Sequence, residues 1–309
     1  MCRSPVDGGP IVTTFTLAHL SDPHLAPLPR ARLGELLNKR GLGYLNWLRN
    51  RRKRHSRAVV DALAADLRAQ TPDHIAVTGD LVNLSLPDEF LAARDWLGTL
   101  GGPDDVSVVP GNHDAYIAAM RVRFPEILAD FMRGDATAPG APPFPYLRRR
   151  GPLALIGAST SVPSGPLMAT GRLGAQQIEA LDALLDSPAL GDAFRVLLIH
   201  HPLRSQNRYK RMTDSDALLA LLKQRRVDLI LHGHDHKHSL MWFEGVASQI
   251  PAIGVPSASN VIDGRHDPAA YNIFRIARDA GNHWRCDWTV RGFQEGREGI
   301  SELRRQTLI

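Results

Sequence analysis

Five short runs of apolar residues, each ending directly at a polar motif, constrain the fold of this 309-residue chain more than any other feature. Such runs are typical of strands that are buried on both faces, and the Gly and Pro residues near their ends indicate tight turns. The runs and motifs are 15–20 before Asp22-Pro23-His24, 74–78 before Gly79-Asp80, 106–109 before Gly111-Asn112-His113-Asp114, 195–199 before His200, and 227–231 before Gly233-His234-Asp235-His236.

Amphipathic helical patterns lie between these runs, at roughly residues 56–70, 88–98, 175–186 and 214–224. Strands that alternate with helices predict an α/β fold with parallel pairing. In open sheets of this kind, ligands bind at the carboxyl ends of the strands. All five motifs follow a run directly, so we expect them to converge at that edge.

The pattern changes after His238, where strand-like segments at 240–243, 248–253, 273–276 and 284–290 follow one another without helices. We expect these segments to form a second, mostly antiparallel sheet packed beside the first. We interpret residues 11–293 as a single domain with a basic insert at about 30–57, and residues 294–309 as a C-terminal tail.

The motifs offer carboxylate and amide oxygens together with imidazole nitrogens, a set that suits Mn, Fe, Co, Ni or Zn ions rather than a thiolate site. A carboxylate can bridge two such ions, and ions about 3.5–4 Å apart can clamp a phosphoryl group during in-line displacement. Each motif alone is also typical of a surface turn, a helix cap or a His-rich tract. Their joint occurrence, each after a buried run, favours a two-metal phosphoesterase.

The ordered series Asp-x-His, Gly-Asp, Gly-Asn-His-Asp, a single His and Gly-His-x-His resembles the calcineurin-like metallophosphoesterase superfamily, from about Thr16 to His236. The resemblance implies an α/β fold, an αββα sandwich of two mixed sheets flanked by helices, with two divalent or trivalent transition-metal ions. It implies one ion on Asp22, His24 and His236, a second on Asn112, His200 and His234, and Asp80 as the bridge.

The resemblance also implies catalytic roles. His113 would face the scissile phosphate and stabilise the developing charge or protonate the leaving oxygen, with Asp114 orienting its ring. A metal-bridging hydroxide would be the nucleophile. We choose His200 over His201 as the ligand, because in family members with His-His-Pro we expect the first histidine to bind the metal.

The compact motifs look most like the bacterial branch that contains cyclic-nucleotide and glycerophosphodiester phosphodiesterases. A dinuclear-metal phosphodiesterase acting on a small-molecule phosphoester is therefore our first choice. A lipid-linked phosphoester or pyrophosphate hydrolase at the membrane surface is the alternative. A nucleic-acid phosphodiesterase or binding protein is less favoured, because the excess bases are confined to one insert and no nucleic-acid module is recognisable.

Residues 30–57 hold ten Lys or Arg and one acid, interleaved with leucines. One interpretation is an amphipathic lid that attracts an anionic substrate or rests on an anionic membrane surface or lipid. The other is a solvated helix whose apolar side packs on the domain or on a partner subunit while its bases face water.

The remaining observations concern location. Cys2 and Cys286 cannot form a disulfide framework, which fits a reducing compartment. The N-terminal residues lack the apolar stretch of a signal peptide, and no run of about 18 apolar residues occurs. We expect a cytoplasmic protein, or one peripheral to the inner face of the membrane if residues 30–57 bind lipid.

Overall fold

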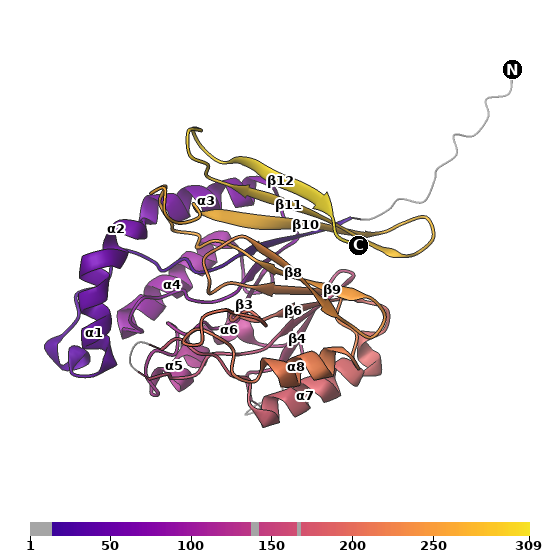
Figure 1. The fold of residues 1–309 in the computed structure, drawn as a ribbon, viewed down its shortest axis with the longest axis horizontal. Helices are drawn as coiled ribbons and strands as arrows, with labels where there is room; N and C mark the ends of the chain where they lie inside the picture. Colours follow the sequence, from indigo (N-terminus) through magenta and orange to yellow (C-terminus); the bar gives the residue numbers. More distant parts are fainter. Residues whose placement is uncertain (1–13, 137–141, 166–167) are drawn as a thin grey trace, which may run out of the picture.

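The computed structural model describes residues 14–136, 142–165 and 168–309. Two six-stranded sheets lie face to face at its centre, as the αββα expectation requires (Figure 1). In the first sheet the order is β12-β11-β10-β1-β2-β3, with β1 (Phe15–Leu20), β2 (His74–Val77), β3 (Val106–Val108), β10 (Ala270–Arg278), β11 (Trp284–Gly292) and β12 (Ser301–Thr307). In the second it is β4-β5-β6-β7-β9-β8, with β4 (Tyr146–Arg150), β5 (Leu153–Gly157), β6 (Phe194–Leu198), β7 (Leu229–His232), β8 (Ser239–Glu244) and β9 (Gln249–Gly254).

Both sheets are mixed; the parallel strands form one half of the first sheet and the centre of the second. Strand β1 pairs in parallel with β2, and β2 with β3, while β10 joins β1 in antiparallel register with Phe15 opposite Ile276. In the second sheet, β5, β6, β7 and β9 run parallel, and β4 and β8 are antiparallel edges. The five predicted runs are therefore the parallel strands β1, β2, β3, β6 and β7.

Helices cover the outer faces of the two sheets. Helices α3 (Arg57–Ala69) and α4 (Pro87–Leu100) pack with the first sheet, and α7 (Ala175–Asp186) and α8 (Ser215–Leu222) lie under the second (Figure 1). Strand β6 shows the layering, because Val196 and Leu198 join the core between the sheets while Leu197 packs against α7 and α8. The shorter helices are α5 (Met120–Ile127), α6 (Ala129–Met132) and the 3-10 turn η3 (Pro188–Leu190).

The expectation of a separate antiparallel sheet after His238 is wrong in its assignment of strands. Strands β8 and β9 extend the second sheet beside β7, whereas β10 and β11 cross over and extend the first beside β1. An alternating pattern indicates which faces of a strand are buried, but not which sheet edge the strand joins. The sequence therefore could not show that the chain crosses from the second sheet to the first after β9. The segment 294–309, interpreted as a tail, contains β12, which pairs with β11.

The basic insert folds into four short helical pieces that project from one end of the sandwich (Figure 1). They are η1 (Leu33–Leu36), α1 (Lys39–Asn46), the π-helical turn η2 (Trp47–Arg51) and α2 (Arg52–Arg54). The guanidinium of Arg40 is buried, and it donates to the carbonyls of Leu84, at 2.9 Å, and Ser85. Lys39 Nζ donates to the Ser164 carbonyl at 3.0 Å. These contacts fix the insert to loops of the main domain.

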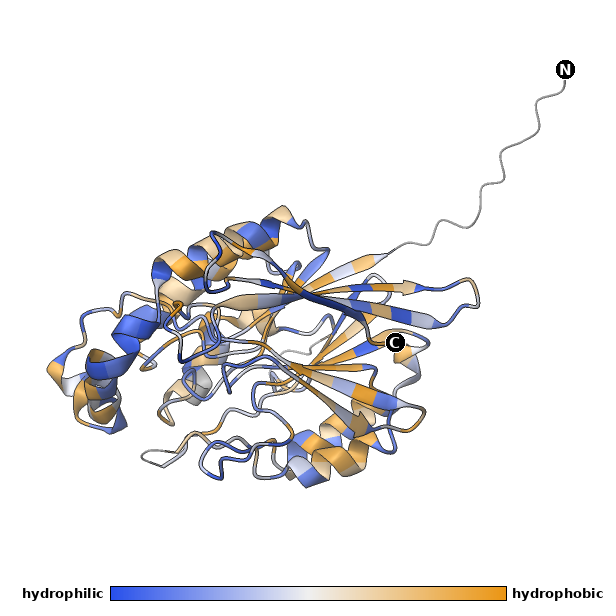
Figure 2. Ribbon diagram, turned by 45° about the horizontal axis from the view of Figure 1, so that its top comes forward, coloured by the Kyte–Doolittle hydropathy of each residue, from blue (hydrophilic) through white to orange (hydrophobic). Residues whose placement is uncertain are grey.

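The surface of the insert agrees with the solvated-helix interpretation for most of its bases but not for its leucines. Arg40 is buried, whereas six bases are exposed, namely Arg30, Arg32, Arg49, Arg52, Lys53 and Arg57. Five leucines are exposed as well, Leu33, Leu37, Leu42, Leu45 and Leu48, and we call them the leucine face. In Figure 2 hydrophobic and hydrophilic residues lie side by side along the insert. Arg40 is buried because its guanidinium finds backbone carbonyl acceptors inside the protein, which a leucine side chain cannot use.

The structure bears on two of the sequence features used to infer location, apolar segments and cysteines. No helix in the described part of the chain is long and apolar enough to cross a lipid bilayer. Cys286 is a buried free thiol in β11, and Cys2 lies outside the described residues.

Candidate metal centre

The loops that follow the five parallel strands bring the seven predicted metal ligands together. Asp22 and His24 follow β1, and Asp80 follows β2; the amide of Asp22 donates to the Gly79 carbonyl at 2.9 Å, which ties these two loops together. Asn112 follows β3, His200 follows β6, and His234 and His236 follow β7. Because parallel strands present their carboxyl ends at the same edge, residues that are 214 positions apart meet there.

Most of these ligands sit in an uncommon backbone conformation. Five of the seven have positive φ, between 38° and 72°, and they are Asp22, His24, Asp80, His234 and His236. Non-glycine residues rarely adopt this left-handed region, and they cluster at functional sites where the surrounding structure holds them. Gly79 has a φ of 94°, and a Cβ atom there would collide with the backbone of Gly111. The motif glycines therefore allow the loops to approach closely.

A first cluster of donor atoms comprises oxygens of Asp22 and Asp80 and the Nε2 atoms of His24 and His236. His236 Nε2 lies 3.1 Å from Asp22 Oδ1 and 3.3 Å from His24 Nε2. His24 Nε2 lies 3.9 Å from Asp22 Oδ1 and 3.7 Å from Asp80 Oδ2. His24 and Asp22 are fully buried.

A second cluster shares the same oxygen of Asp80. His200 Nε2 lies 3.5 Å from Asp80 Oδ2 and 3.3 Å from Asn112 Oδ1. His234 Nδ1 lies 2.9 Å from Asn112 Oδ1 and 3.3 Å from His200 Nε2. The other oxygen, Asp80 Oδ1, accepts from the amide of His113 at 2.7 Å, and this bond turns Oδ2 toward both clusters.

Both clusters fit a transition-metal ion. Donors bound to one ion at about 2.0–2.2 Å lie roughly 2.9–4.2 Å apart, depending on the coordination geometry, and the distances above fall within this range. Ligand histidines are usually held at their second nitrogen by a neighbouring acceptor. Here His24 Nδ1 lies 3.1 Å from the Val82 carbonyl, and His200 Nδ1 lies 2.6 Å from the Thr78 carbonyl. Their Nε2 atoms therefore face the clusters.

Opposite charges dominate the electrostatics between Asp80 and His200. Burial alone would raise the pKa of Asp80, but His200, His113 and His24 lower it well below its usual value. Burial would likewise lower the pKa of His200, yet the Asp80 carboxylate raises it to about 10. Asp80 is therefore a permanent anion at the centre of the site, as a bridging ligand has to be.

His201 lies beside the second cluster, and one of its ring nitrogens is within 4.8 Å of ring nitrogens of His200 and His234. Its Nδ1 lies 2.7 Å from Thr160 Oγ1, and its Nε2 lies 3.2 Å from the Ala169 carbonyl. Both ring nitrogens are thus used by the protein. Of the two neighbouring histidines, His200 is the one whose free nitrogen faces the other predicted ligands.

His113 lies beside the first cluster and is only partly buried. Its Nδ1 is 2.6 Å from the Asn83 carbonyl, and its ring stacks on Tyr116 with centroids 5.4 Å apart. Burial and the neighbouring Arg51 lower the pKa of His113 to about 3, so its ring is neutral in this arrangement.

Asp114 does not have the position predicted for it. Its Oδ1 accepts from the amides of Leu81 and Val82 at 2.9 and 3.2 Å, and its Oδ2 accepts from the amide of Gly111 at 2.8 Å. A short side chain that caps three backbone amides cannot also reach the ring of His113. Asp114 therefore fixes the loop after Asp80, and Asn83 and Tyr116 orient the His113 ring.

Three residues at the end of the insert also reach the site, and the sequence analysis missed them. Arg51 places Nη1 2.9 Å from His113 Nε2 and Nη2 3.0 Å from His24 Nε2. Arg54 Nη2 lies 2.9 Å from His236 Nδ1, and the ring of His55 packs on His24 with centroids 4.6 Å apart. Their spacing of three and four residues could have indicated a shared helix face. In the sequence they lie within a run of bases, for which both a lid and a solvated helix remained open.

The comparisons with known proteins agree with this fold. Residues 15–238 match the calcineurin-like phosphoesterase family, and the chain therefore belongs to that family. A protein named as a probable cyclic nucleotide phosphodiesterase from Synechococcus sp. is 24% identical over 235 residues, which are 74% of this chain and 81% of that protein. The glycerophosphodiester phosphodiesterase GpdQ of Enterobacter lignolyticus is 36% identical over 64 residues, which are 20% of this chain and 22% of that enzyme.

Solved structures share the fold at low sequence identity. A dimetal phosphatase from Danio rerio superposes with a TM-score of 0.59 at 15% identity, over 95% of this chain and 98% of that chain. A purple acid phosphatase from yellow lupin gives the same TM-score of 0.59 at 14% identity, over 96% of this chain and 53% of that chain. At these identities the likeness establishes the fold alone.

Proposed function

We propose that this protein is a dinuclear-metal phosphodiesterase that hydrolyses small-molecule phosphodiesters with two ions drawn from Mn, Fe, Co, Ni and Zn. The observation that carries the proposal is that two donor clusters share a single oxygen, Asp80 Oδ2. Asp22, His24 and His236 would hold one ion, and Asn112, His200 and His234 the other. When bound, two such ions polarise the phosphoryl group and activate water as the nucleophile.

The residues around the clusters supply the remaining chemistry. The Asn83 carbonyl holds Nδ1 of His113, so that Nε2 points toward the guanidinium of Arg51. An anionic phosphoryl group bound between them would offset the charge of Arg51 and favour the protonated imidazole. In that state His113 stabilises charge on a phosphoryl oxygen or gives a proton to the leaving oxygen.

Arg51 has the geometry to bind the phosphoryl group itself. Guanidinium groups bind phosphate oxygens through two parallel N–H donors. Both terminal nitrogens of Arg51 lie at about 3 Å from ring nitrogens of the site. With an ion on His24 Nε2, the guanidinium would lose that acceptor, and a phosphoryl oxygen would offer it a charged one, which makes a stronger hydrogen bond.

Hydrolysis of bis(p-nitrophenyl) phosphate by protein reconstituted with Mn²⁺ or Co²⁺ tests the proposal. We expect His113→Ala to reduce turnover by about 10²–10⁴-fold, the contribution typical of a general acid, while two ions per chain remain bound. The matched control is His283→Ala, a histidine whose side chain is 82% exposed, and it should behave like the unaltered protein. The proposal is wrong if protein carrying two ions hydrolyses no phosphoester.

The names of the relatives support a substrate class within the phosphodiesters. One relative is named as a probable cyclic nucleotide phosphodiesterase and the other as a glycerophosphodiester phosphodiesterase. We expect turnover of cyclic nucleotides or glycerophosphodiesters to exceed that of p-nitrophenyl phosphate, a monoester, under the same metal loading. Higher activity on the monoester would contradict the diesterase assignment and leave a phosphomonoesterase.

The leucine face favours a second candidate, a hydrolase of lipid-linked phosphoesters or pyrophosphates. Leu42, Leu45 and Leu48 are 57%, 48% and 40% exposed, and exposed Arg49, Arg52 and Lys53 follow them in the chain. Apolar side chains beside bases are typical of segments that rest on an anionic bilayer. Since the same insert carries Arg51 to the metal centre, a lipid bound there would lie close to the reacting phosphate.

Flotation with vesicles of phosphatidylglycerol and phosphatidylcholine separates the two candidates. If lipid is the partner, the protein should float with these vesicles, and Leu42→Gln with Leu45→Gln should abolish binding. The control is Leu91→Gln on α4, where the leucine is similarly exposed at 45%. Absence of binding by the unaltered protein would exclude the lipid-linked candidate and leave the first one in place.

A further inference from the structure

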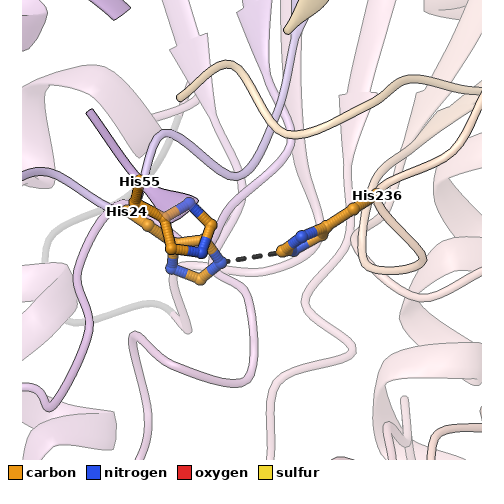
Figure 3. A group of neighbouring side chains, drawn as sticks. All are labelled: His24, His55 and His236. Carbon is orange, nitrogen blue, oxygen red and sulfur yellow. Dashed lines mark hydrogen bonds between the residues drawn. The ribbon is translucent and has the colours of Figure 1, made fainter. Parts of the chain in front are cut away.

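His55 ends the insert and lies against the first donor cluster, although it belongs to none of the five motifs. One ring nitrogen each of His24, His55 and His236 lie within 4.8 Å of one another. Figure 3 shows the rings of His24 and His55 together on one side and the ring of His236 facing them. His55 is 3% exposed. A histidine from outside the motifs is therefore buried at the edge of the cluster.

The backbone of His55 is fixed from both sides. Its amide donates to the Arg51 carbonyl at 2.9 Å, and the amide of Ser56 donates to the Ser259 carbonyl at 2.9 Å. His55 also forms an isolated antiparallel bridge with Asn260. The loop after β9 therefore clamps this residue, which places its ring as firmly as the rings on the strand ends.

A chain of hydrogen bonds orients the ring of His55. Nδ1 lies 2.8 Å from Ser259 Oγ, which lies 3.2 Å from Ser257 Oγ, and this hydroxyl donates to the backbone carbonyl of Asp22 at 2.7 Å. A carbonyl only accepts, so Ser257 gives its proton to Asp22 and can accept from Ser259. With Ser259 donating to Ser257, the proton of His55 sits on Nδ1, and Nε2 holds a lone pair.

His55 Nε2 has no hydrogen-bond partner within the described part of the chain and is shielded from solvent. A buried polar atom without a partner is destabilising, and next to a cluster of donor atoms a bound ion is one way to satisfy it. A neutral imidazole that is held at one nitrogen by a hydroxyl and has its other lone pair free is the usual state of a metal-ligating histidine.

We propose that His55 is an additional protein ligand of the ion held by Asp22, His24 and His236, and that it is contributed by the basic insert. The inference rests on the metal centre of the proposed function. His55 forms its group with the two histidine ligands, whereas Asp22 and Asp80 share a separate group with the same two histidines, so His55 would reach the ion from the side of the insert. The insert would then complete the metal site as well as cover it.

Metal binding by the metal-free protein tests this proposal without depending on turnover. Titration with Mn²⁺ in a calorimeter gives affinity and stoichiometry, and the visible absorption of the Co²⁺-loaded protein reports the coordination of each ion. For His55→Ala we expect binding of one of the two ions to weaken by about 10–100-fold, the range known for loss of a supporting group, and the Co²⁺ bands of that ion to change. The second ion should bind as before.

The matched control is His74→Ala. His74 is a fully buried histidine whose Nε2 lies 2.8 Å from Ser107 Oγ, like Nδ1 of His55 from Ser259, but it starts β2, at the end of the strand opposite the metal centre. It should lower thermal stability without altering either metal affinity or the Co²⁺ spectrum. His55→Gln, of similar polarity and smaller change in volume, serves if the alanine variant does not fold.

The outcomes distinguish this inference from the function it rests on. If the unaltered protein binds two ions and His55→Ala binds both with the same affinity and the same Co²⁺ spectrum, the role of His55 is refuted and the two-metal function stands. If the unaltered protein binds no transition-metal ion, the metal centre and the role of His55 fall together.

Discussion

At the scale of single residues, the site depends on residues whose backbone conformation is unfavourable for any residue other than glycine. Five predicted ligands adopt positive φ, and they keep it because the loops that carry them are tied to one another, as when the amide of Asp22 bonds to Gly79 and that of His24 bonds to Asp80. Asp114, the aspartate of the Gly-Asn-His-Asp motif, also stabilises a loop. Its side chain accepts hydrogen bonds from three loop amides and does not contact the ring of His113.

The clearest single-residue prediction concerns Arg51. We expect Arg51→Ala to lower kcat/KM by about 10²–10³-fold, the loss typical when a donor to transition-state charge is removed, and to weaken inhibition by inorganic phosphate. Lysine should restore little, because an ammonium group cannot make two parallel hydrogen bonds. Steady-state kinetics on one phosphodiester would measure both effects.

Arg49→Ala is the matched control for Arg51, because Arg49 lies two residues earlier on the same turn and is exposed. Its removal should leave kcat/KM within about twofold, in keeping with the small effects of surface charges. Equal losses for the two variants would mean that Arg51 acts only through the charge of the insert and does not contact the phosphoryl group.

At the scale of elements, contacts between helix and sheet fix the geometry on which the site depends. Helix α3 follows His55 directly and packs on β10 and β11. Asp66 on α3 accepts from Arg291 on β11 at 2.8 and 2.9 Å and from the hydroxyl of Tyr271 on β10 at 2.5 Å. These hydrogen bonds join α3, the helix that follows the insert, to β10 and β11 of the first sheet.

We therefore expect Asp66→Asn to lower the free energy of unfolding by about 1–3 kcal/mol, because hydrogen bonds to charged groups are worth this much and Arg291 would lose its counter-charge. Urea denaturation followed by circular dichroism measures the change. The control is Asp61→Asn, which breaks an exposed i,i+4 pair with Arg57 on the same helix. Asp61→Asn should change the free energy of unfolding by no more than about 0.5 kcal/mol. A loss as large as that of Asp66→Asn would contradict a special role for the contacts of Asp66 with Arg291 and Tyr271.

At the scale of the whole molecule, folding buries several histidines in neutral form. Burial, with Arg150 and Arg148 nearby, lowers the pKa of His74 to about 3, well away from the metal centre. The unfolded chain takes up a proton at this residue below about pH 6.5, whereas the folded chain does not. The unfolded state therefore binds more protons, so the stability of the fold falls as the pH is lowered.

Replacing His74 should reduce this dependence on pH. Between pH 7 and pH 5 we expect His74→Gln to lose about 2 kcal/mol less of its free energy of unfolding than the unaltered protein. Chemical denaturation at the two pH values measures the difference. Equal pH dependence in His74→Gln and in the unaltered protein would show that His74 is protonated in the folded state.

The sequence by itself determined the five parallel strands, the family and the set of residues that meet at the strand ends. These follow from local patterns, because a buried strand needs a continuous apolar run and a ligand needs a particular side chain after it. Asp22, Asp80 and His234 could therefore be named from their motifs alone.

Only the tertiary structure decided the rest. The exchange of β10 and β11 into the first sheet and the choice of His200 over His201 depend on contacts between segments far apart in the chain. So does the inward turn of Arg51 and His55, which a run of bases hides because the sequence cannot tell a solvated arginine from one that finds acceptors inside. The five motifs indicated a candidate metal centre, whereas the contacts of Arg51 and His55 with it are seen only in the folded chain.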